Sequence, residues 1–483
     1  MSEQVRIDLE DPTGNFWVDN GLVVLAERYG ASAELDLEQV QLDLIPKLRR
    51  VETDGSLKWT LPATSFIDGQ KLKAFSKSKT PFLSWKAFSQ RSTSICAICG
   101  RRDAAADIKQ FIYPLLVEGA KFSNFLPNLN PRSSKICPRC SLASIVAYTG
   151  LIWRYQKKVL HLFLFYTSDL FELLRLRREV ISPLTIAAES SGNAKFAFVG
   201  EFIHETSLGL ILELFSELHR SDGLLSEEAR VYLTSLLGAE VSLSRSHLVL
   251  YAITGEKGRG FNMKSFREFS RLHAFYQLYK SWLEILEGPA PYQNVVGIFK
   301  QFQTRRNDQL ETIWRDRIAW AILEFEDPLP FIEQFLFEAR VKEKNPKPLV
   351  YGTERIFEYY TKEVLGMDEQ FLKVLKGFGH NLGRRAQKGN EMGLLYALRN
   401  AKNLDELHRV LTDILFRLNS KLEAGQRPLT VPEELLKIEK GERICGVPWK
   451  RVKNLLSIYA MNAYLWSSQG QSEQQEKEGD SYE

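Results

Sequence analysis

The amino-acid sequence predicts an α+β protein, with a mixed N-terminal body that carries an inserted four-cysteine zinc module and an all-α C-terminal bundle. Three observations lead to this fold class. Apolar runs of strand type alternate with helical segments in the first part of the chain, two C-x-x-C pairs interrupt them, and apolar residues later recur every three or four positions. With 483 residues, 44% of them hydrophobic, the chain can bury more than one core.

The N-terminal elements follow from turn and capping residues. Asp19 or Asn20 is a candidate helix N-cap, and Asp54-Gly55 is a pair typical of hairpin turns. The elements expected here are a turn at Gly14-Asn15, a helix through Val23 to Tyr29, a helix from Leu35 to Arg50 and a hairpin from Val51 to Pro62.

The central part of the chain is expected to mix strands with helices. The expected strands are Val159 to Tyr166, Ala194 to Phe202 and Val241 to Tyr251. The expected helices are Asp169 to Val180, Leu208 to Arg220, Phe266 to Leu286, Arg305 to Phe325 and Leu329 to Val341.

A polar, proline-containing stretch separates the two expected domains. The body is predicted to span 1–341, including a zinc module at 91–145, and is followed by a linker at 342–350. A helical bundle at 351–466 and a disordered tail at 467–483, rich in Gln, Glu and Ser, complete the chain. Within the bundle, Gly377 to Gly383 lacks the preceding strand and the spacing of a dinucleotide fingerprint, so these glycines indicate close helix packing.

Four of the five cysteines form two pairs, Cys96 with Cys99 and Cys137 with Cys140. Two such pairs can bring four thiolates around one tetrahedral ion, and zinc is the natural occupant. Because protein fills all four positions, the zinc would be structural rather than catalytic. The alternatives are two unrelated thiol pairs, two disulfides of a secreted protein, or a redox dithiol, which would explain only one pair.

Basic residues are concentrated around the cysteines. From Gly69 to Ser168 there are sixteen Lys or Arg and only three acids, although the whole chain carries a net charge of only +4. A solvated surface normally mixes both signs, so the shortage of acids predicts a polyanionic partner. Lysines interleaved with aromatic rings between Gly69 and Arg102 suit a nucleic-acid strand, although each ring can equally belong to a core.

Several polar groups are candidates for contact with nucleic acid. The stretch Asn124 to Arg132 between the cysteine pairs, called the asparagine loop here, could probe base edges or could simply form Asn-Pro turns. The turn from Gly255 to Gly260 could touch phosphates. Four cations near the cysteines, Arg101, Arg102, Lys135 and Arg139, could instead offset the charge of zinc-bound thiolates. The candidate nucleic-acid-binding residues are Asn15, Lys71, Lys73, Lys77, Lys79, Asn124, Asn128, Asn130, Arg132, Lys135, Lys257, Arg259, Arg384 and Arg385.

No enzymatic activity is expected. A zinc deaminase needs His-x-Glu upstream of Pro-Cys-x-x-Cys, but the first histidine is His161, and Ile136 occupies the proline position. The seven histidines are scattered away from nucleophiles and carboxylate clusters. Met1 to Pro12 is polar and lacks the features of a signal peptide, and the apolar runs are too short to span a membrane, so a cytoplasmic protein is expected.

The stretch Thr13 to Gly21, the two widely spaced C-x-x-C pairs and the helical C-terminus together resemble the CXXC-CXXC branch of large subunits of type I-B CRISPR Cascade complexes. The resemblance spans nearly the full length, but its specific part is the stretch Asn15 to Gly21 and the four cysteines. The family phrase usually reads Gly-Asn-Pro-Phe-Val-Asp-Ala-Gly, whereas this chain has Phe16-Trp17 in place of Pro-Phe and Asn20 in place of Ala.

The resemblance implies a non-catalytic subunit of an RNA-guided complex. Such a subunit sits at the 5′ end of the guide RNA, recognises the protospacer-adjacent motif in double-stranded target DNA and supports R-loop formation, while RNA pairing reads the target sequence. Its partners would be the other Cascade subunits and either a helicase-nuclease or a transposition adaptor, with no membrane. The alternative is a zinc-ribbon scaffold that binds only protein, its lysines serving solubility.

Overall fold

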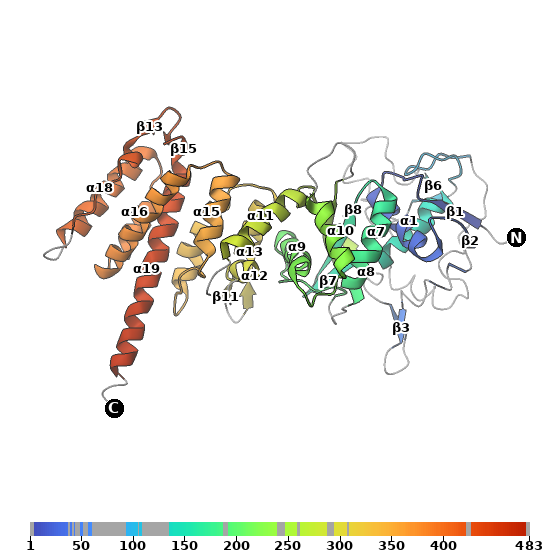
Figure 1. Cartoon of the computed structure of the whole chain (residues 1–483), viewed down its shortest axis with the longest axis horizontal. Helices are drawn as coiled ribbons and strands as arrows, with labels where there is room; N and C mark the ends of the chain where they lie inside the picture. Colours follow the sequence, from blue (N-terminus) through green and yellow to red (C-terminus); the bar gives the residue numbers. More distant parts are fainter. Residues whose placement is uncertain are drawn as a thin grey trace. The chain divides into compact units, whose positions relative to one another are not determined.

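The computed structural model describes most of the chain as two compact units, Met1–Gln277 and Leu278–Glu483 (Figure 1). The residues it describes are 4–36, 39–40, 43, 49–51, 57–59, 93–104, 106–108, 135–186, 192–238, 247–257, 261–286, 294–306, 309–421 and 427–479. The structure combines helices with several small antiparallel sheets, as the sequence predicts, and its C-terminal region is helical. The division lies ahead of the expected linker at 342–350, which belongs to the second unit.

The N-terminal unit begins with two short strands and the helix between them. Strand β1 (Gln4–Asp8) pairs antiparallel with β2 (Ser32–Asp36), and α1 (Phe16–Tyr29) connects them. The helix starts earlier than expected because Asn15, not Asp19 or Asn20, is its N-cap. Asp19 instead accepts hydrogen bonds from the backbone N–H groups of Thr13 and Gly14, which closes the turn ahead of the helix.

The expected helix from Leu35 to Arg50 is wrong at both ends, because β2 occupies its start and β3 (Arg49–Val51) its end. Strand β3 pairs antiparallel with β4 (Leu57–Trp59), which confirms that these strands form a hairpin, whereas the expected turn residues Asp54-Gly55 lie outside the described residues.

A four-stranded antiparallel sheet in the order β10-β9-β8-β7 supports the core of this unit. Trp17 of α1 packs with apolar side chains of the sheet, including Leu162 and Ile253. The strands are β7 (Ile152–Gln156), β8 (Val159–Tyr166), β9 (Val249–Lys257) and β10 (Phe261–Phe269). The prediction of β8 is confirmed at both ends, whereas β10 occupies a region that was expected to begin a helix. The apolar spacing from Phe266 onward predicts a helix, but pairing with β9 makes Phe261–Phe269 a strand, with a bulge between Met263 and Ser265.

Most of the other described residues of this unit are helical. Ala194 to Phe202, expected to be a strand, is irregular because it packs against α9: Ala197 donates its N–H to the carbonyl of Gly209 at 3.0 Å. The helical elements are α6 (Pro138–Val146), η2 (Ala147–Gly150), α7 (Leu170–Leu176), η3 (Arg177–Ile181), α8 (Ser182–Ile186), α9 (Ile203–His219), α10 (Glu227–Gly238) and α11 (Leu272–Leu286), the last of which continues into the second unit.

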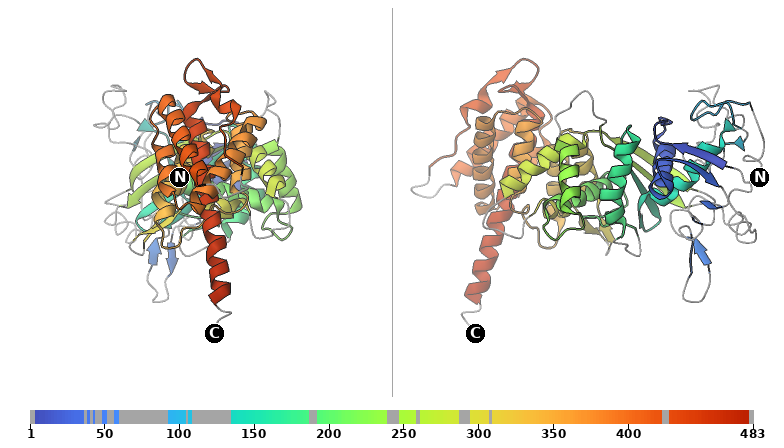
Figure 2. Two further views of the ribbon diagram at one scale, coloured as in Figure 1. Left: turned by 90° about the vertical axis from the view of Figure 1, so that its left-hand side faces the viewer. Right: turned by 45° about the vertical axis from the view of Figure 1, so that its right-hand side comes forward.

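The second unit is mainly helical. Its helical elements are α12 (Val295–Lys300), α13 (Ile313–Leu323), α14 (Leu329–Gln334), η4 (Phe335–Ala339), η5 (Arg340–Lys342), α15 (Thr353–Glu363), α16 (Glu369–Lys388), α17 (Met392–Asn400), α18 (Leu404–Ser420), η6 (Glu433–Leu436) and α19 (Trp449–Gly479). Its strands are β11 (Thr304–Arg306), β12 (Gln309–Glu311), β13 (Ile438–Glu439), β14 (Arg443–Ile444) and β15 (Val447–Pro448). Helix α19 continues past Trp466, where a disordered tail was expected, and extends beyond α16 (Figure 2).

The expected linker is instead held inside the unit. Leu349 donates its N–H to the side-chain oxygen of Asn462 on α19 at 2.7 Å, and Val350 donates to that of Gln301 at 2.9 Å. These hydrogen bonds are the physical reason that the predicted boundary does not separate two bodies. Among the described residues, no helix is long and apolar enough to cross a membrane.

Close packing between α16 and α19 confirms the interpretation of the glycine run. A Cβ atom added at Gly383 would lie 2.0 Å from the carbonyl oxygen of Ala460, and one added at Gly379 would lie 2.7 Å from the Cβ atom of Tyr459. Because only glycine avoids these overlaps, the two helix backbones can approach each other here.

Candidate metal centre

The first cysteine pair forms a tight turn. Gly100 donates its N–H to the carbonyl of Cys96 at 3.0 Å, and Gly100 adopts a φ of +76°, a conformation that glycine reaches without steric cost. The turn therefore presents the sulfurs of Cys96 and Cys99 on the same side.

The second cysteine pair uses the start of a helix. Cys137 is the N-cap of α6, and Pro138 at the first helical position supplies a backbone angle suited to helix initiation. The N–H of Cys140 points to the sulfur of Cys137 at 3.4 Å, and the N–H of Cys137 points to the sulfur of Cys96 at the same distance. Backbone donors thus orient the two pairs toward each other.

The four sulfurs form one cluster. All of them lie within 4.8 Å of one another, and the Sγ atoms of Cys99 and Cys137 are 3.6 Å apart. Tetrahedral thiolates at about 2.3 Å from one zinc ion would be separated by roughly 3.8 Å, so the donor set fits a structural metal with all four ligands supplied by protein. Cys96, Cys137 and Cys140 are buried, and Cys99 is half-buried.

The protonation of the cluster also favours a cation. Hydrogen bonds from Cys137 and Cys140 lower the pKa of Cys96, whereas hydrogen bonding to Cys137 and Cys96, together with burial, raises the pKa of Cys140. Without a cation, negative charge gathered on one sulfur opposes ionisation of its neighbour. A bound divalent metal removes this conflict because it stabilises all the thiolates together.

Two arginines beside the cysteines pair with one carboxylate. Both Arg101 and Arg139 form ion pairs with Asp11, and Arg139 also donates to the backbone carbonyl of Asp8 at 3.1 Å. Burial lowers the pKa of Arg101, but the hydrogen bond to Asp11 and the charge of Asp11 outweigh burial and raise that pKa. These cations therefore belong to the fold around the metal site, one of the two roles that the sequence left open.

The helix of the second cysteine pair packs closely on α1. Trp17 donates its indole N–H to the carbonyl of Ser144 at 2.9 Å, and a Cβ atom added at Gly21 would lie 1.8 Å from the carbonyl oxygen of Ala143. The Thr13 to Gly21 stretch is thus joined directly to the metal site. Asp11 was missed by the sequence analysis, because nothing in its local pattern marks a partner that lies 128 positions away.

The predicted nucleic-acid-binding residues are not gathered into one described site. The side-chain oxygen of Asn15 accepts from the N–H of Val18, the backbone of Lys135 pairs with the first cysteine turn, and Lys257 ends β9 at the hairpin tip. Arg384 and Arg385 are neighbours on α16 with different surroundings, described below. The predictions for Lys71, Lys73, Lys77, Lys79, Asn124, Asn128, Asn130, Arg132 and Arg259 lie outside the described residues.

Comparison with family models, with curated proteins and with solved structures finds no match to this chain.

Proposed function

We propose that this chain is the non-catalytic large subunit of an RNA-guided CRISPR surveillance complex, with one structural zinc ion bound by the four cysteines. In this role it recognises the protospacer-adjacent motif in double-stranded DNA, contacts the 5′ region of the guide RNA, supports R-loop formation and recruits a downstream effector. The motif-reading groups would lie near the zinc module, with the asparagine loop as the first candidate.

The observation that carries the proposal is the position of the four-cysteine cluster inside the acid-poor stretch Gly69 to Ser168. Zinc would fix a rigid base there, and sixteen cations against three acids suit a phosphate backbone. The internal pairing described above accounts for Arg101 and Arg139, and Lys157 pairs with Glu201. Among the described residues, Arg102 and Lys158 are exposed and form no ion pair.

The second candidate is a zinc-stabilised scaffold that binds only protein. The specific observation in its favour is that Arg101 and Arg139 both form ion pairs with Asp11. These two cations therefore stabilise the fold rather than presenting charge to a ligand. The two candidates differ in what the remaining lysines do, and that difference can be measured.

The test is a salt titration of duplex DNA binding by the chain purified with the partners encoded beside it. Changing Lys71, Lys73 and Lys77 to Gln should reduce the slope of log affinity against log salt by about 0.9 for every phosphate that a lysine no longer neutralises. The matched control changes Lys342, Lys344 and Lys347 to Gln, because these lysines are exposed in the second unit and their replacement removes the same charge.

Equal slopes for both triple variants and the unaltered chain would favour the scaffold. A reduced slope in the first variant alone would support the nucleic-acid role. A CRISPR repeat array beside the gene would further favour the assignment to an RNA-guided complex.

A further inference from the structure

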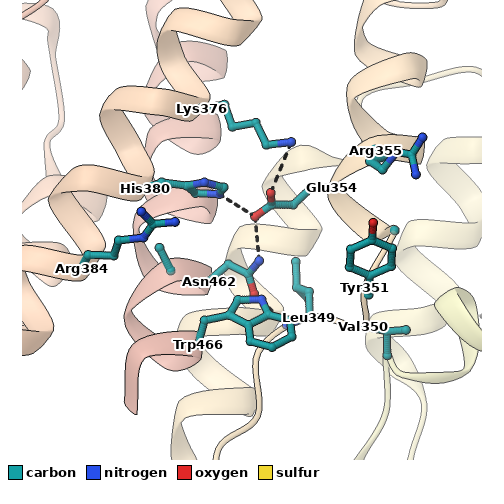
Figure 3. Close-up of a pocket in the computed structure, with 12 residues that line it drawn as sticks. Leu349, Val350, Tyr351, Glu354, Arg355, Lys376, His380, Arg384, Asn462 and Trp466 are labelled. Atoms are coloured by element: carbon teal, nitrogen blue, oxygen red, sulfur yellow. Dashed lines mark hydrogen bonds and ion pairs between the residues drawn. The ribbon is translucent and has the colours of Figure 1, made fainter. Parts of the chain in front are cut away.

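A pocket of about 300 Å³ lies within the second unit, between the start of α15, one face of α16 and the middle of α19 (Figure 3). This volume is at the lower end of the range for small-molecule sites. The charged and aromatic residues of its lining include Tyr351, Glu354, Arg355, Lys376, Arg384 and Trp466. None of them belongs to the metal centre or to the basic stretch Gly69 to Ser168.

Glu354 organises the floor of the pocket. Its carboxylate accepts hydrogen bonds from His380 Nε2 at 3.1 Å and from Asn462 Nδ2 at 2.6 Å, and Lys376 Nζ lies 3.7 Å from its second oxygen. Burial raises the pKa of Glu354, but these three partners outweigh burial and hold the pKa below its usual range. The carboxylate is therefore charged and fixes side chains from α16 and α19.

The negative charge of Glu354 does not neutralise the arginines of the pocket. Lys376 pairs with Glu354 and also with Glu358 at 2.9 Å, so these three side chains together carry a net charge of −1, which is smaller than the +2 of Arg355 and Arg384. Arg355 and Arg384 are exposed, and neither forms a hydrogen bond or an ion pair within the described parts of the chain. They lie on opposite sides of Glu354 (Figure 3). The pocket thus offers one guanidinium group on each side of the carboxylate, and a guanidinium binds phosphate oxygens through paired hydrogen bonds.

Two large aromatic rings in the lining are left exposed. Trp466 is 50% exposed and Tyr351 is 55% exposed, although most large rings in this unit are buried. An exposed indole beside a preorganised polar floor can stack on a planar ring, and such stacking contributes about 1 to 3 kcal/mol for a nucleic-acid base. The chemistry of the lining therefore matches a ligand that combines a planar ring with a phosphate.

We propose that this pocket binds a nucleoside phosphate, with Trp466 stacking on the base and a guanidinium, that of Arg384 on one side of Glu354 or that of Arg355 on the other, binding each phosphate. The ligand can be a free mononucleotide or one unit of a single strand, which has a phosphate on each side of the nucleoside. This site is separate from the proposed DNA-reading role, because a chain that joined no RNA-guided complex would still have it.

The experiment titrates the full chain by calorimetry with AMP, adenosine, inorganic phosphate and a short single-stranded oligoadenylate. AMP or the oligoadenylate should bind about tenfold more tightly than adenosine or inorganic phosphate. The reason is that adenosine lacks the phosphate and inorganic phosphate lacks the base. If the oligoadenylate binds with much higher affinity than AMP, the natural ligand is a single strand. If the two affinities are equal, the natural ligand is a free nucleotide.

The variants Arg384→Gln and Arg355→Gln should each weaken binding of the oligoadenylate about tenfold, and one of the two should weaken binding of AMP to the same extent. Trp466→Ala should weaken binding of both probes about fivefold or more. Matched controls are Arg409→Gln and Phe416→Ala, because Arg409 and Phe416 on α18 are highly exposed and lie outside the pocket. Unchanged melting temperatures establish that the exposed substitutions leave the fold intact. The proposal is overturned if no probe binds at millimolar concentration, if phosphate alone binds as tightly as AMP, or if pocket variants bind like the controls.

Discussion

The guanidinium of Arg139, which is 3% exposed, donates from Nη1 to the carboxylate of Asp11 at 3.1 Å. Arg139 immediately precedes Cys140, and Asp11 follows β1, so this ion pair joins the second cysteine pair to the N-terminal strand. A buried arginine that loses its carboxylate keeps the cost of desolvation without the compensating attraction.

Asp11→Asn should therefore destabilise the N-terminal unit. Because Asp11 is half-exposed, a decrease of about 1 to 3 kcal/mol in the free energy of unfolding is expected rather than the larger cost of a fully buried pair. The measurement is the urea concentration at which bound metal is released, followed with a chromogenic chelator. Glu10→Gln is the control, since Glu10 is exposed and forms no ion pair among the described residues. Release at the same urea concentration in both variants would show that the pair does not stabilise the site.

One metal ion should be bound by the four-cysteine cluster. Elemental analysis of the purified chain is expected to give about one zinc per chain, and Cys96→Ser or Cys137→Ser should lose the metal because three thiolates no longer complete the tetrahedron. Cys445→Ser should retain it, because Cys445 lies outside the cluster. A chain that folds without metal, or that retains zinc after Cys137→Ser, would contradict the assignment.

Alanine at two glycines of α16 should have opposite effects on stability. A Cβ atom at Gly383 would lie 2.0 Å from a backbone oxygen of α19, whereas one at Gly377 meets nothing within 4 Å. Gly383→Ala is expected to destabilise the second unit by more than about 2 kcal/mol, because backbone cannot move aside easily. Gly377→Ala should stabilise it by roughly 0.5 to 1 kcal/mol through helix propensity. Urea unfolding followed by circular dichroism measures both, and effects of equal sign would refute the packing argument.

Two glutamates of the second unit should give opposite pH dependences of stability. The pKa of Glu354 is lowered from 4.5, so its contribution is present above that value and is lost as pH falls through the folded-state pKa. Burial raises the pKa of Glu333 despite the ion pair with Arg399, so the folded state takes up its proton more readily and gains stability as pH falls toward 4.5.

The comparison is made with Glu354→Gln and Glu333→Gln in parallel. From neutral pH to about 4, the free energy of unfolding of the unaltered chain should decrease relative to that of Glu354→Gln. Over the same pH range it should increase relative to that of Glu333→Gln. Parallel trends for the two variants would show that at least one of these shifts is assigned the wrong sign.

Sequence reasoning succeeded where short-range chemistry decides the structure. The apolar run of β8, the spacing of the four cysteines and the glycines of α16 each carry their structural meaning within a few residues. It failed where a distant partner decides. Strand β10 is set by pairing with β9, and the segment 342–350 is held by Asn462, which lies more than a hundred positions away. The local sequence pattern of β10 or of segment 342–350 does not indicate either partner.

The pocket of the second unit shows the same limit at a candidate site. Arg384 and Arg385 are adjacent and look equivalent in the sequence, yet Arg385 bonds to Asn419 and to the carbonyl of Arg427, whereas Arg384 lines the pocket. Glu354 and Trp466 reach the same site from two other helices. The separate functions of neighbouring residues on a helix become visible only when its partner helices are placed.

The pairing of β5 (Ala106–Asp107) with β6 (Lys135–Ile136) has a consequence for how this chain can vary among relatives. Asp107 pairs with Lys135, so the chain leaves and re-enters the cysteine module at neighbouring positions, and the cost of closing a chain segment rises only slowly with its length. Insertions, deletions or exchange of the whole segment would therefore leave the cysteine positions unchanged. The same two junctions are therefore suitable for grafting a segment from another protein while the supporting module stays constant.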